Sequence, residues 1–396
     1  MALILAIESS CDETSAAVVR SGEELLSNVV YSQIATHAQY GGVVPELASR
    51  EHLRAIVPVV REALAQAGQA FQTIDAIAVT QGPGLAGALL VGITYAKALA
   101  FALNKPLIAV NHLEGHIHAV LLEGRQSGSE LRFPALALVV SGGHTHLYLV
   151  NSPQASSAAW RYTPVGHTLD DAAGEAFDKV AKLLGLGYPG GPIIEYLAQH
   201  GNSSSVKFAP AQIKLREKGI APDPNARKNP RTRGGTLQQQ QMPRFDFSFS
   251  GIKTAVLRYV QTHEMQSAID ARRRALAQIP KPAMEDYLTH CDPQTLDLIA
   301  SFQRAVVDDL AGKTLAAAEE YGAQGLLVTG GVAANSRLRE RSTERAERLG
   351  LSVHFPSRKL STDNAAMIAA AAFPKFVAGE FSDPQFSAEA SLALGG

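Results

Sequence analysis

The sequence has too few cysteines, and too balanced a charge, for several specialised classes of protein. Only two cysteines, Cys11 and Cys291, occur in 396 residues, which excludes a disulfide-stapled fold and suits a reducing compartment. Lys and Arg number 36 against 37 Asp and Glu, so the net charge of −1 provides no global attraction to nucleic acid. The 33 glycines and 20 prolines are scattered and 46% of the residues are hydrophobic, which excludes a collagen-like or wholly disordered chain.

Long apolar runs are also scarce. The run Leu3–Ile7 is too short for the core of an export signal and leads directly into Glu8. The stretch Leu85–Leu103 has about the length of a membrane span, but it contains Lys97 and two glycines. We interpret it as a buried or amphipathic helix, and we expect a soluble, cytoplasmic protein.

The chain does contain a repeated pattern of strands and helices, and its length predicts about two domains. An opening strand, polar turn and strand are repeated by Leu136–Val140, Ser141–Thr145 and His146–Val150. The other strands are predicted at Leu3–Ile7, Ser15–Val19, Leu26–Tyr31, Ala76–Thr80, Leu107–Val110, Gly325–Thr329 and Leu351–Phe355, and the helices at Pro45–Ala67, Leu85–Leu103, Asp171–Leu184, Pro192–Gln199, Gly251–Thr262, Thr295–Tyr321 and from Asp363 onward. This alternation predicts α/β lobes with a cleft between them.

One region does not fit a compact lobe. From Lys207 to Arg244 the sequence has no strand or helix periodicity, and nine basic residues against two acidic ones give it a local charge of +7. It is either a solvated insertion or an electrostatic arm that contacts phosphates.

Two histidines have the spacing of metal ligands. His112 and His116 are four residues apart at the start of a helix that Asn111 is expected to cap, so both imidazoles lie on one helix face. Glu114 lies on the opposite side, which differs from the zinc-protease pattern HExxH. His118 also falls off the shared face, and we interpret it as structural. The pair alone leaves metal binding and a structural role open.

Two glycine turns follow predicted strands. Glycines in Ser141-Gly-Gly143 let backbone N–H groups approach an anion, although tight hairpins also need glycine. Gly330-Gly331 lies between a strand and a helix, where the helix N-terminus attracts negative charge, and Asn335 could contact a ribose or base. We expect the two turns to lie on strands of different sheets and to hold a nucleotide across the cleft.

Several carboxylates lie close to these turns in the sequence. The acidic side chains around Asp178 follow helical spacing, and they either form a solvated face or bind ribose hydroxyls. Glu195 lies one turn into the next helix. Asp363 is expected at the start of the last helix, where it either caps that helix or supplies an oxygen ligand beside His112 and His116.

Eight motifs occur together in one order. They are Ile7-Glu-Ser-Ser-Cys-Asp-Glu-Thr14, Val44-Pro-Glu-Leu-Ala-Ser-Arg-Glu-His52, Gly82-Pro-Gly-Leu85, His112-Leu-Glu-Gly-His116, Val140-Ser-Gly-Gly-His144, Phe247-Ser-Phe-Ser-Gly-Ile-Lys253, Gly330-Gly-Val-Ala-Ala-Asn335 and Ser361-Thr-Asp-Asn364. Over most of residues 3–375 the sequence therefore resembles the bacterial tRNA N6-adenosine threonylcarbamoyltransferase family (TsaD, formerly described as glycoproteases).

The resemblance implies an actin/Hsp70/sugar-kinase fold, an α/β architecture in which two RNase H-like lobes enclose a nucleotide and metal cleft. We expect an N-terminal lobe over residues 1–111, joined by the last helix at 363–380. The C-terminal lobe would cover 112–362, with the basic insertion at 203–244. That insertion and the stretch from His263 to Pro293 are longer than is usual in the family.

The resemblance also implies roles for individual residues. The metal ligands of the family fall on His112, His116 and Asp363, which implies one divalent ion per subunit, iron or alternatively zinc. Asp12 and Glu13 match acidic residues important for activity. The substrate-binding positions fall on Val139, Val140, Ser141, Gly142, Gly143, Asp178, Gly191, Glu195 and Asn335. Because Val139 stands where archaeal and eukaryotic relatives have a tyrosine ligand, water or substrate would complete the coordination.

The implied activity is a metal-dependent acyl transfer. The threonylcarbamoyl group of threonylcarbamoyl-AMP would move to the N6 amine of the adenosine 3′ of the anticodon, in tRNAs that read codons starting with A. An activated donor is needed because the lone pair of that amine is delocalised into the purine ring. Besides tRNA, the implied partners are an inactive paralogue (TsaB-like), a P-loop ATPase (TsaE-like) and the enzyme that forms the adenylate (TsaC-like), with no membrane.

Three alternatives differ from this interpretation. A metal-dependent peptidase would explain the histidines but not the glycine turns. An actin-fold ATP-dependent kinase would use Mg²⁺ and an aspartate base, and it would have no need for paired histidines. A non-catalytic scaffold would not need His112, His116 and Asp363 together.

Overall fold

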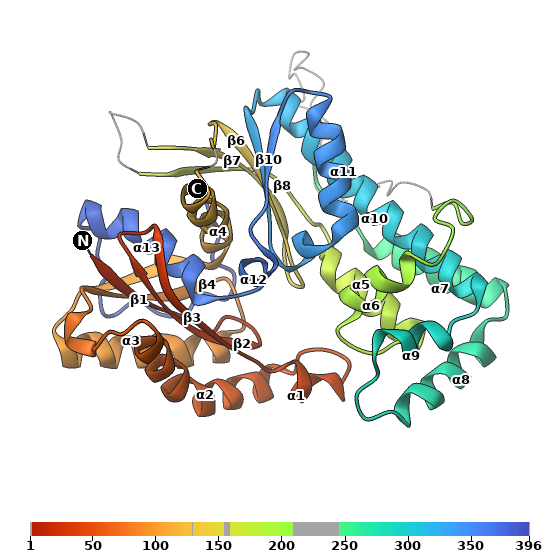
Figure 1. The fold of residues 1–396 in the computed structure, drawn as a ribbon, viewed down its shortest axis with the longest axis horizontal. Coiled ribbons are helices and arrows are strands. Elements are labelled where there is room, and N and C mark those ends of the chain that lie inside the picture. The colour runs from red at the N-terminus through yellow and green to blue at the C-terminus, as the bar shows by residue number, and fades with distance from the viewer. Residues whose placement is uncertain (1, 129, 154–158, 209–244, 396) are drawn as a thin grey trace, which may run out of the picture.

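The computed structural model describes residues 2–128, 130–153, 159–208 and 245–395. Within these residues the chain forms two five-stranded sheets, with helices between them and on their outer faces (Figure 1). The basic segment Lys207–Arg244 lies outside the described residues from position 209 to its end, so both interpretations of it stay predictions.

The two sheets share one strand order and one set of directions. In each, the central strand pairs antiparallel with the next strand in the chain and parallel with a later one. The first sheet has the order β3 (Glu24–Ser32), β2 (Glu13–Arg20), β1 (Leu3–Glu8), β4 (Ala76–Gly82) and β5 (Leu107–Asn111). The second has the matching order β8 (Arg161–His167), β7 (Thr145–Asn151), β6 (Ala135–Val140), β9 (Gly325–Thr329) and β10 (Ser352–His354). The predicted repeat and the α/β class are confirmed.

Continuous apolar runs such as β1 are buried because helices cover both faces of each sheet. On the first sheet, α2 (Pro45–Gln66) and α3 (Ala86–Leu103) pack on one face, and α13 (Ala365–Ala378) packs on the other. The second sheet is covered on one face by α5 (Ala173–Leu183), α6 (Gly190–Ala198), α10 (Pro293–Glu320) and α11 (Ser336–Glu347).

Helix α4 (His112–Gln126) lies between the two sheets and contacts both cores. Its Ala119 and Leu122 pack with α13 and the first sheet, whereas Ile117 and Val120 pack on the second. Thr329 of β9 donates a hydrogen bond to the carbonyl of His116 at 2.8 Å. The helix that carries both histidines is therefore fixed from two sides. The lobe boundary at residue 111, immediately before this helix, stays a prediction.

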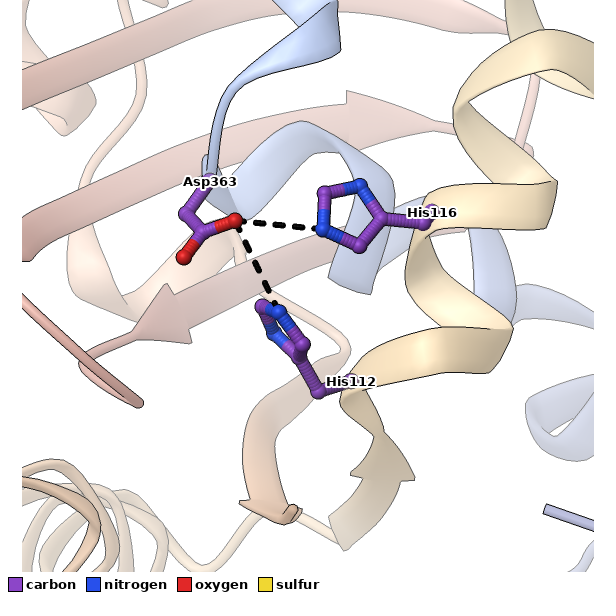
Figure 2. A group of neighbouring side chains, drawn as sticks. All are labelled: His112, His116 and Asp363. Atoms are coloured by element: carbon purple, nitrogen blue, oxygen red, sulfur yellow. Dashed lines mark ion pairs between the residues drawn. The ribbon is translucent and has the colours of Figure 1, made fainter. Parts of the chain in front are cut away.

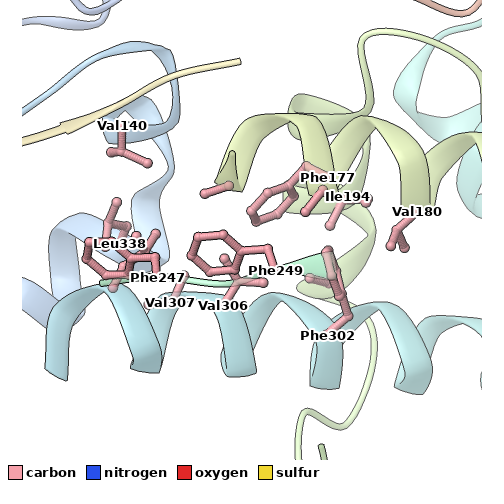
Figure 3. Close-up of a cluster of buried hydrophobic side chains, with 14 of the residues drawn as sticks. Val140, Phe177, Val180, Ile194, Phe247, Phe249, Phe302, Val306, Val307 and Leu338 are labelled. Carbon is pink, nitrogen blue, oxygen red and sulfur yellow. The ribbon is translucent and has the colours of Figure 1, made fainter. Parts of the chain in front are cut away.

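The largest core lies beneath the second sheet (Figure 3). Phe177 of α5 meets Phe302 of α10 edge to face, with ring centroids 5.3 Å apart. Phe247 and Phe249, from the segment that precedes α7 (Ser250–Thr262), are also buried in this core. These aromatic contacts hold α5 and α6, and thus their polar side chains, at a fixed position relative to the sheet.

Some elements were not predicted from the sequence. Strand β8 contains Pro164 and Gly166, which weaken its alternating pattern. Helices α8 (Gln266–Ala277) and α9 (Met284–Thr289) fill the stretch after His263. The remaining short elements are α1 (Ile34–Ala38), η1 (Phe71–Thr73), η2 (Gly331–Ala334) and α12 (Arg358–Ser361).

Helix α3 is the one described helix that is long and apolar enough to cross a bilayer, by length and composition alone. One face of it is buried against the first sheet and α2, through Leu89, Ile93, Ala96 and Ala100. This packing confirms the prediction of a helix with a buried face.

Candidate metal and nucleotide site

A cavity of about 510 Å³ opens where the carboxyl ends of strands from both sheets face each other. Its walls contain most of the residues that the sequence singled out. They include Asp12, Glu13, His112, Ser141, Gly142, Gly143, Asp178, Gly191, Glu195, Gly331, Asn335 and Asp363. Residues more than 300 positions apart in the chain thus meet in one place.

Two imidazoles and a carboxylate converge beside this cavity (Figure 2). His112 and Asp363 line the cavity, and His116 is buried behind them. Nε2 of His116 lies 3.1 Å, and Nε2 of His112 3.6 Å, from the same oxygen of Asp363. One potential ligand atom from each of the three residues lies within 4.8 Å of the others. As predicted, Asn111 caps the helix, because its side chain accepts a hydrogen bond from the N–H of Leu113 at 2.9 Å.

The alternative role of Asp363 as a helix cap is wrong. Asn364 caps α13 instead, accepting a hydrogen bond from the N–H of Met367 at 3.2 Å. The carboxylate of Asp363 is therefore available to the imidazoles. Both ring nitrogens of His116 are buried and, within the described chain, have no hydrogen-bond partner besides the ion pair with Asp363. A divalent cation would satisfy Nε2, so the residues present fit a metal ion.

Glu8 contacts His112 from the side opposite Asp363. Its Oε2 lies 3.2 Å from Nδ1 of His112, and it is fully buried. Thr80 and the N–H of Ser10 donate hydrogen bonds to the same carboxylate, at 2.6 and 2.5 Å. Because Nδ1 faces a carboxylate, Nε2 is the nitrogen left to face Asp363.

The charges in the cluster shift each other's pKa. Burial alone would lower the pKa of His112, but Asp363 and Glu8 beside it raise the pKa to about 9. Burial also opposes ionisation of Glu8 and Asp363, yet the neighbouring imidazoles hold the pKa of both carboxyls below the usual range. His144 also lines the cavity, and its pKa is lowered to about 3 by burial and by the neighbouring charge of His112. The metal-free cluster is thus a buried imidazolium between two carboxylates.

The polar turn between β1 and β2 forms a second wall. His52 holds it at both ends, since its Nε2 lies 3.0 Å from the carbonyl of Cys11 and its Nδ1 2.7 Å from the hydroxyl of Thr14. Asp12 and Glu13 lie between these two contacts. Burial, and then the nearby charge of Asp12, raise the pKa of Glu13 well above its ordinary value. The raised pKa favours the protonated form of Glu13.

The glycine turns do not come from different sheets, so that expectation is wrong. Strands β6 and β9 are neighbours in the second sheet, and their turns lie side by side. Gly330 lies so close to Val140 that a Cβ there would collide with the backbone oxygen of Val140. Gly142, Gly143 and Gly331 instead have open space where a Cβ would be. The first sheet contributes the Ser10–Glu13 turn to the cavity.

The other polar residues of the cavity already have protein partners. Asp178 accepts a hydrogen bond from the N–H of Gly190 at 2.7 Å, and burial raises its pKa to about 6. Glu195 accepts from the hydroxyl of Ser336 at 2.7 Å. The amide of Asn335 caps α11 and donates to Gln303 at 2.9 Å. Contacts of these residues with a substrate stay predictions.

Two predicted substrate positions do not line the cavity. The side chains of Val139 and Val140 are fully buried in separate cores, on the two faces of the second sheet. Glu114, by contrast, lies as predicted. It points away from the proposed metal ligands and contacts Lys375 and Tyr162, at 2.8 and 3.3 Å. His118 contacts the hydroxyl of Tyr162 at 2.8 Å, in keeping with a structural role.

Sequence reasoning missed the contribution of Glu8. The available signal was a carboxylate at the end of an apolar strand that is buried on both sides, where an unpaired charge is costly. It also missed Ala390, which lies in the cavity wall although it follows the last predicted helix.

The sequence comparisons with known proteins agree on one family. Residues 24–370 match the family described as "tRNA N6-adenosine threonylcarbamoyltransferase" (TsaD). A relative of that name from Koribacter versatilis is 66% identical over 394 residues, 99% of each chain. Another, from Syntrophotalea carbinolica, is 48% identical over 392 residues, 99% of this chain and 97% of the relative. Full-length HypF is similar in fold, with a TM-score of 0.55 and 14% identity over 96% of this chain and 47% of that one.

Proposed function

The chain belongs to the tRNA N6-adenosine threonylcarbamoyltransferase family, and we propose that it transfers a threonylcarbamoyl group from threonylcarbamoyl-AMP to the N6 amine of the adenosine 3′ of the anticodon. The acceptors would be tRNAs that read codons starting with A. The observation that carries this proposal is the cavity whose wall contains His112 and Asp363 together with the glycine turns, with His116 buried beside these two residues. A cation site and an anion site side by side suit a substrate with both a threonyl carboxylate and a nucleotide phosphate.

His112, His116 and Asp363 would hold the divalent ion, which we propose to be iron(II), with zinc as the alternative. When bound, the ion would supply positive charge that orients the donor and polarises its carbamoyl group. Two imidazoles and one carboxylate leave coordination positions for water or substrate, since Val139 is buried and has no ligand atom.

The glycine turns would bind the nucleotide part of the donor. Gly142, Gly143 and Gly331 have no side chain in the way, so backbone N–H groups can approach a phosphate closely. Asp178, Gly191, Glu195 and Asn335 form the adjoining wall and would contact ribose and purine. Holding the donor at a fixed geometry contributes up to about 7–11 kcal/mol to catalysis.

Asp12 is our choice for the base that removes the proton from the attacking amine. It lies in the cavity wall beside Glu13, whose pKa is raised by burial and by the nearby charge of Asp12. Asp12→Asn and Asp12→Ala should slow single-turnover transfer while leaving donor binding intact. Unchanged transfer rates in both variants would exclude a base role for Asp12.

The partners that the family resemblance implies belong to this proposal. We propose that the chain acts in the cytoplasm with an inactive paralogue, a P-loop ATPase and the enzyme that forms the adenylate. The basic residues between Lys207 and Arg244 could add contacts to tRNA phosphates. A peptidase is disfavoured, because Glu114 is engaged with Lys375 and does not face the metal ligands.

One assay tests the transferase activity directly. The purified chain is incubated with the partner proteins, threonine, bicarbonate, ATP and unmodified tRNA, and the digested RNA is analysed for threonylcarbamoyladenosine. The same reaction with the His112→Ala/His116→Ala variant tests the need for the metal site, and metal analysis of both proteins identifies the ion. Absence of the modified nucleoside with the wild-type chain would refute the proposal.

A further inference from the structure

The segment after α13, residues Ser382–Gly395, crosses from one sheet to the other, and we call it the strap. It begins beside the edge strand β5, where the N–H of Ser382 donates to Leu107 and the N–H of Ala109 donates to the hydroxyl of Ser382, at 2.9 and 2.7 Å. Further along, the ring of Phe386 packs on the first core, with the ammonium of Lys97 4.5 Å from its centroid. This half of the strap is anchored to the first sheet.

The middle of the strap contacts the turn that follows β4. The N–H of Glu389 donates to the carbonyl of Gln81 at 3.0 Å, and the side chain of Gln81 donates to that of Glu389 at 2.8 Å. Gly82 must be glycine here, because a Cβ would collide with the backbone oxygen of Glu389. The N–H of Gly84 donates to the carbonyl of Ala390 at 3.2 Å. Two residues of the strap, Glu389 and Ala390, are therefore hydrogen-bonded to this turn and the end of β4.

The same turn contacts the acidic wall of the cavity on its other side. The N–H of Leu85 donates to the carbonyl of Ser10 at 2.8 Å. The turn Gly82–Gly84 thus lies between the strap and the Ser10–Glu13 turn, and Ala390 of the strap itself lines the cavity. Hydrogen bonds thus link the strap, through Gly84 and Leu85, to the backbone two residues before Asp12.

The far end of the strap is anchored to the second sheet. Asn111, which ends β5 of the first sheet and precedes α4, donates to the carbonyls of Leu392 and Ala393, at 3.4 and 3.1 Å, before the strap reaches the second sheet. Leu394 is buried in the core that α4 forms with β6 and β7. Gly395 packs against the backbone of Tyr162 in β8. In Figure 1 the C-terminal end of the chain accordingly lies beside α4.

We propose that the strap is a positioning element of the active site. It ties both sheets to the Gly82–Gly84 turn, and so sets the distance between the acidic wall on the first sheet and the glycine turns on the second. This inference rests on the proposed function only in taking the cavity as the nucleotide site. The strap has no role in proton transfer; it acts through the placement of Gly84 and Ala390.

Leu394→Asp tests the strap at its far anchor, because a carboxylate cannot be buried in that core without a partner. We expect AMP to bind about 10- to 100-fold more weakly by calorimetry, the donor KM to rise more than kcat falls, and hydrogen exchange to increase at residues 8–14 and 82–84. Leu394→Met keeps the apolar contact, so AMP affinity, the kinetic constants and hydrogen exchange should all stay at their wild-type values. Gln385→Ala changes an exposed strap residue and should leave them unchanged.

A chain that ends at Ala388 provides a second variant, which lacks the Glu389 and Ala390 contacts but keeps Phe386. This shortened chain should lose as much AMP affinity as Leu394→Asp does. Thermal melting of the core around α2 and α3 should stay unchanged. If either variant releases the strap, as seen by hydrogen exchange, yet binds AMP like the wild type, the strap has no positioning role. AMP affinity and exchange report on the strap even if the wild-type chain fails to modify tRNA, a failure that would refute only the proposed function.

Discussion

The Glu8 carboxylate lies 3.2 Å from Nδ1 of His112, so a residue at the end of the first strand fixes the orientation of an imidazole on the fourth helix. The contact links the first sheet to the imidazole that we propose as a metal ligand on α4. Ser10 and Thr80 donate hydrogen bonds to this carboxylate, so the imidazole orientation depends on two chain segments outside α4.

Glu8→Gln should weaken metal binding without removing a ligand. A neutral amide can either accept a hydrogen bond from Nδ1–H or donate one to Nδ1, so it no longer fixes the tautomer of His112, and metal affinity should fall about 10- to 100-fold. Titration with Co²⁺, followed by its visible absorption, measures the affinity. As a control, Glu114→Gln removes another buried carboxylate, which pairs with Lys375. This variant should retain the wild-type metal affinity. Equal affinity in the Glu8 variant would contradict an orienting role.

Metal affinity should rise with pH. In the metal-free chain the pKa of His112 is raised to about 9, so below that pH a cation must displace a proton. The apparent affinity for Zn²⁺ should therefore increase about tenfold per pH unit between pH 6.5 and 8.5. Calorimetry in two buffers of different ionisation enthalpy would detect the released proton. A flat pH profile would show that His112 is already neutral.

The same pKa shift stabilises the metal-free fold. The contribution is fully present below 6.5, the ordinary pKa of the imidazole, and is lost as the pH rises through about 9. Urea unfolding of the metal-free protein at pH 6 and pH 9.5 should show this loss. The His112→Ala variant serves as the control, because it should lack that part of the pH dependence.

The two neighbouring glycines of the β9 turn should respond differently to alanine. Gly330 has a positive φ of 94° and backbone in the place of a Cβ, so Gly330→Ala should destabilise the fold by about 2 kcal/mol or more. Gly331 has open space there and lines the cavity, so Gly331→Ala should keep its stability and weaken AMP binding instead. Melting curves and calorimetry of both variants separate the two effects. Equal melting temperatures would argue against the close packing at Gly330.

The buried guanidinium of Arg272 should be a major support of the α8–α9 region. It donates to the carbonyls of Leu184 and His290 and to the hydroxyl of Thr295, at 2.7, 3.0 and 2.9 Å. Arg272→Met leaves these acceptors without their donor and should lower the free energy of unfolding by about 3 kcal/mol. The neighbouring Arg273 is exposed, and Arg273→Met should change stability by less than about 0.5 kcal/mol. Chemical denaturation of both variants provides the comparison.

The sequence allowed much of the fold to be predicted, because its main elements are encoded locally. Apolar runs such as Leu136–Val140 indicate buried strands, and the 3.6-residue period of Pro45–Ala67 indicates a helix. Strand β8 was missed because Pro164 and Gly166 obscure its pattern. The order of strands in each sheet could not be derived from periodicity, which carries no information about neighbours.

For the site, the i, i+4 spacing of His112 and His116 was sufficient to place both imidazoles on one face of α4, since helix geometry fixes it. The sequence left the role of Asp363 open between a cap and a ligand. The structure excludes the cap, because Asn364 caps α13, and the ligand role stays a prediction. The sheet membership of the two glycine turns was predicted wrongly, because strand pairing depends on contacts distant in the sequence.

The sequence by itself determined which groups this protein has available: two imidazoles on one helix turn, glycine turns at strand ends, and acidic residues after the first strand. Only the tertiary structure decided that Glu8 faces His112, that Val139 is buried away from the cavity, and that the strap joins both sheets. The physical reason is that local geometry follows from neighbouring residues, whereas the meeting of distant side chains follows from how the two sheets and α4 pack together.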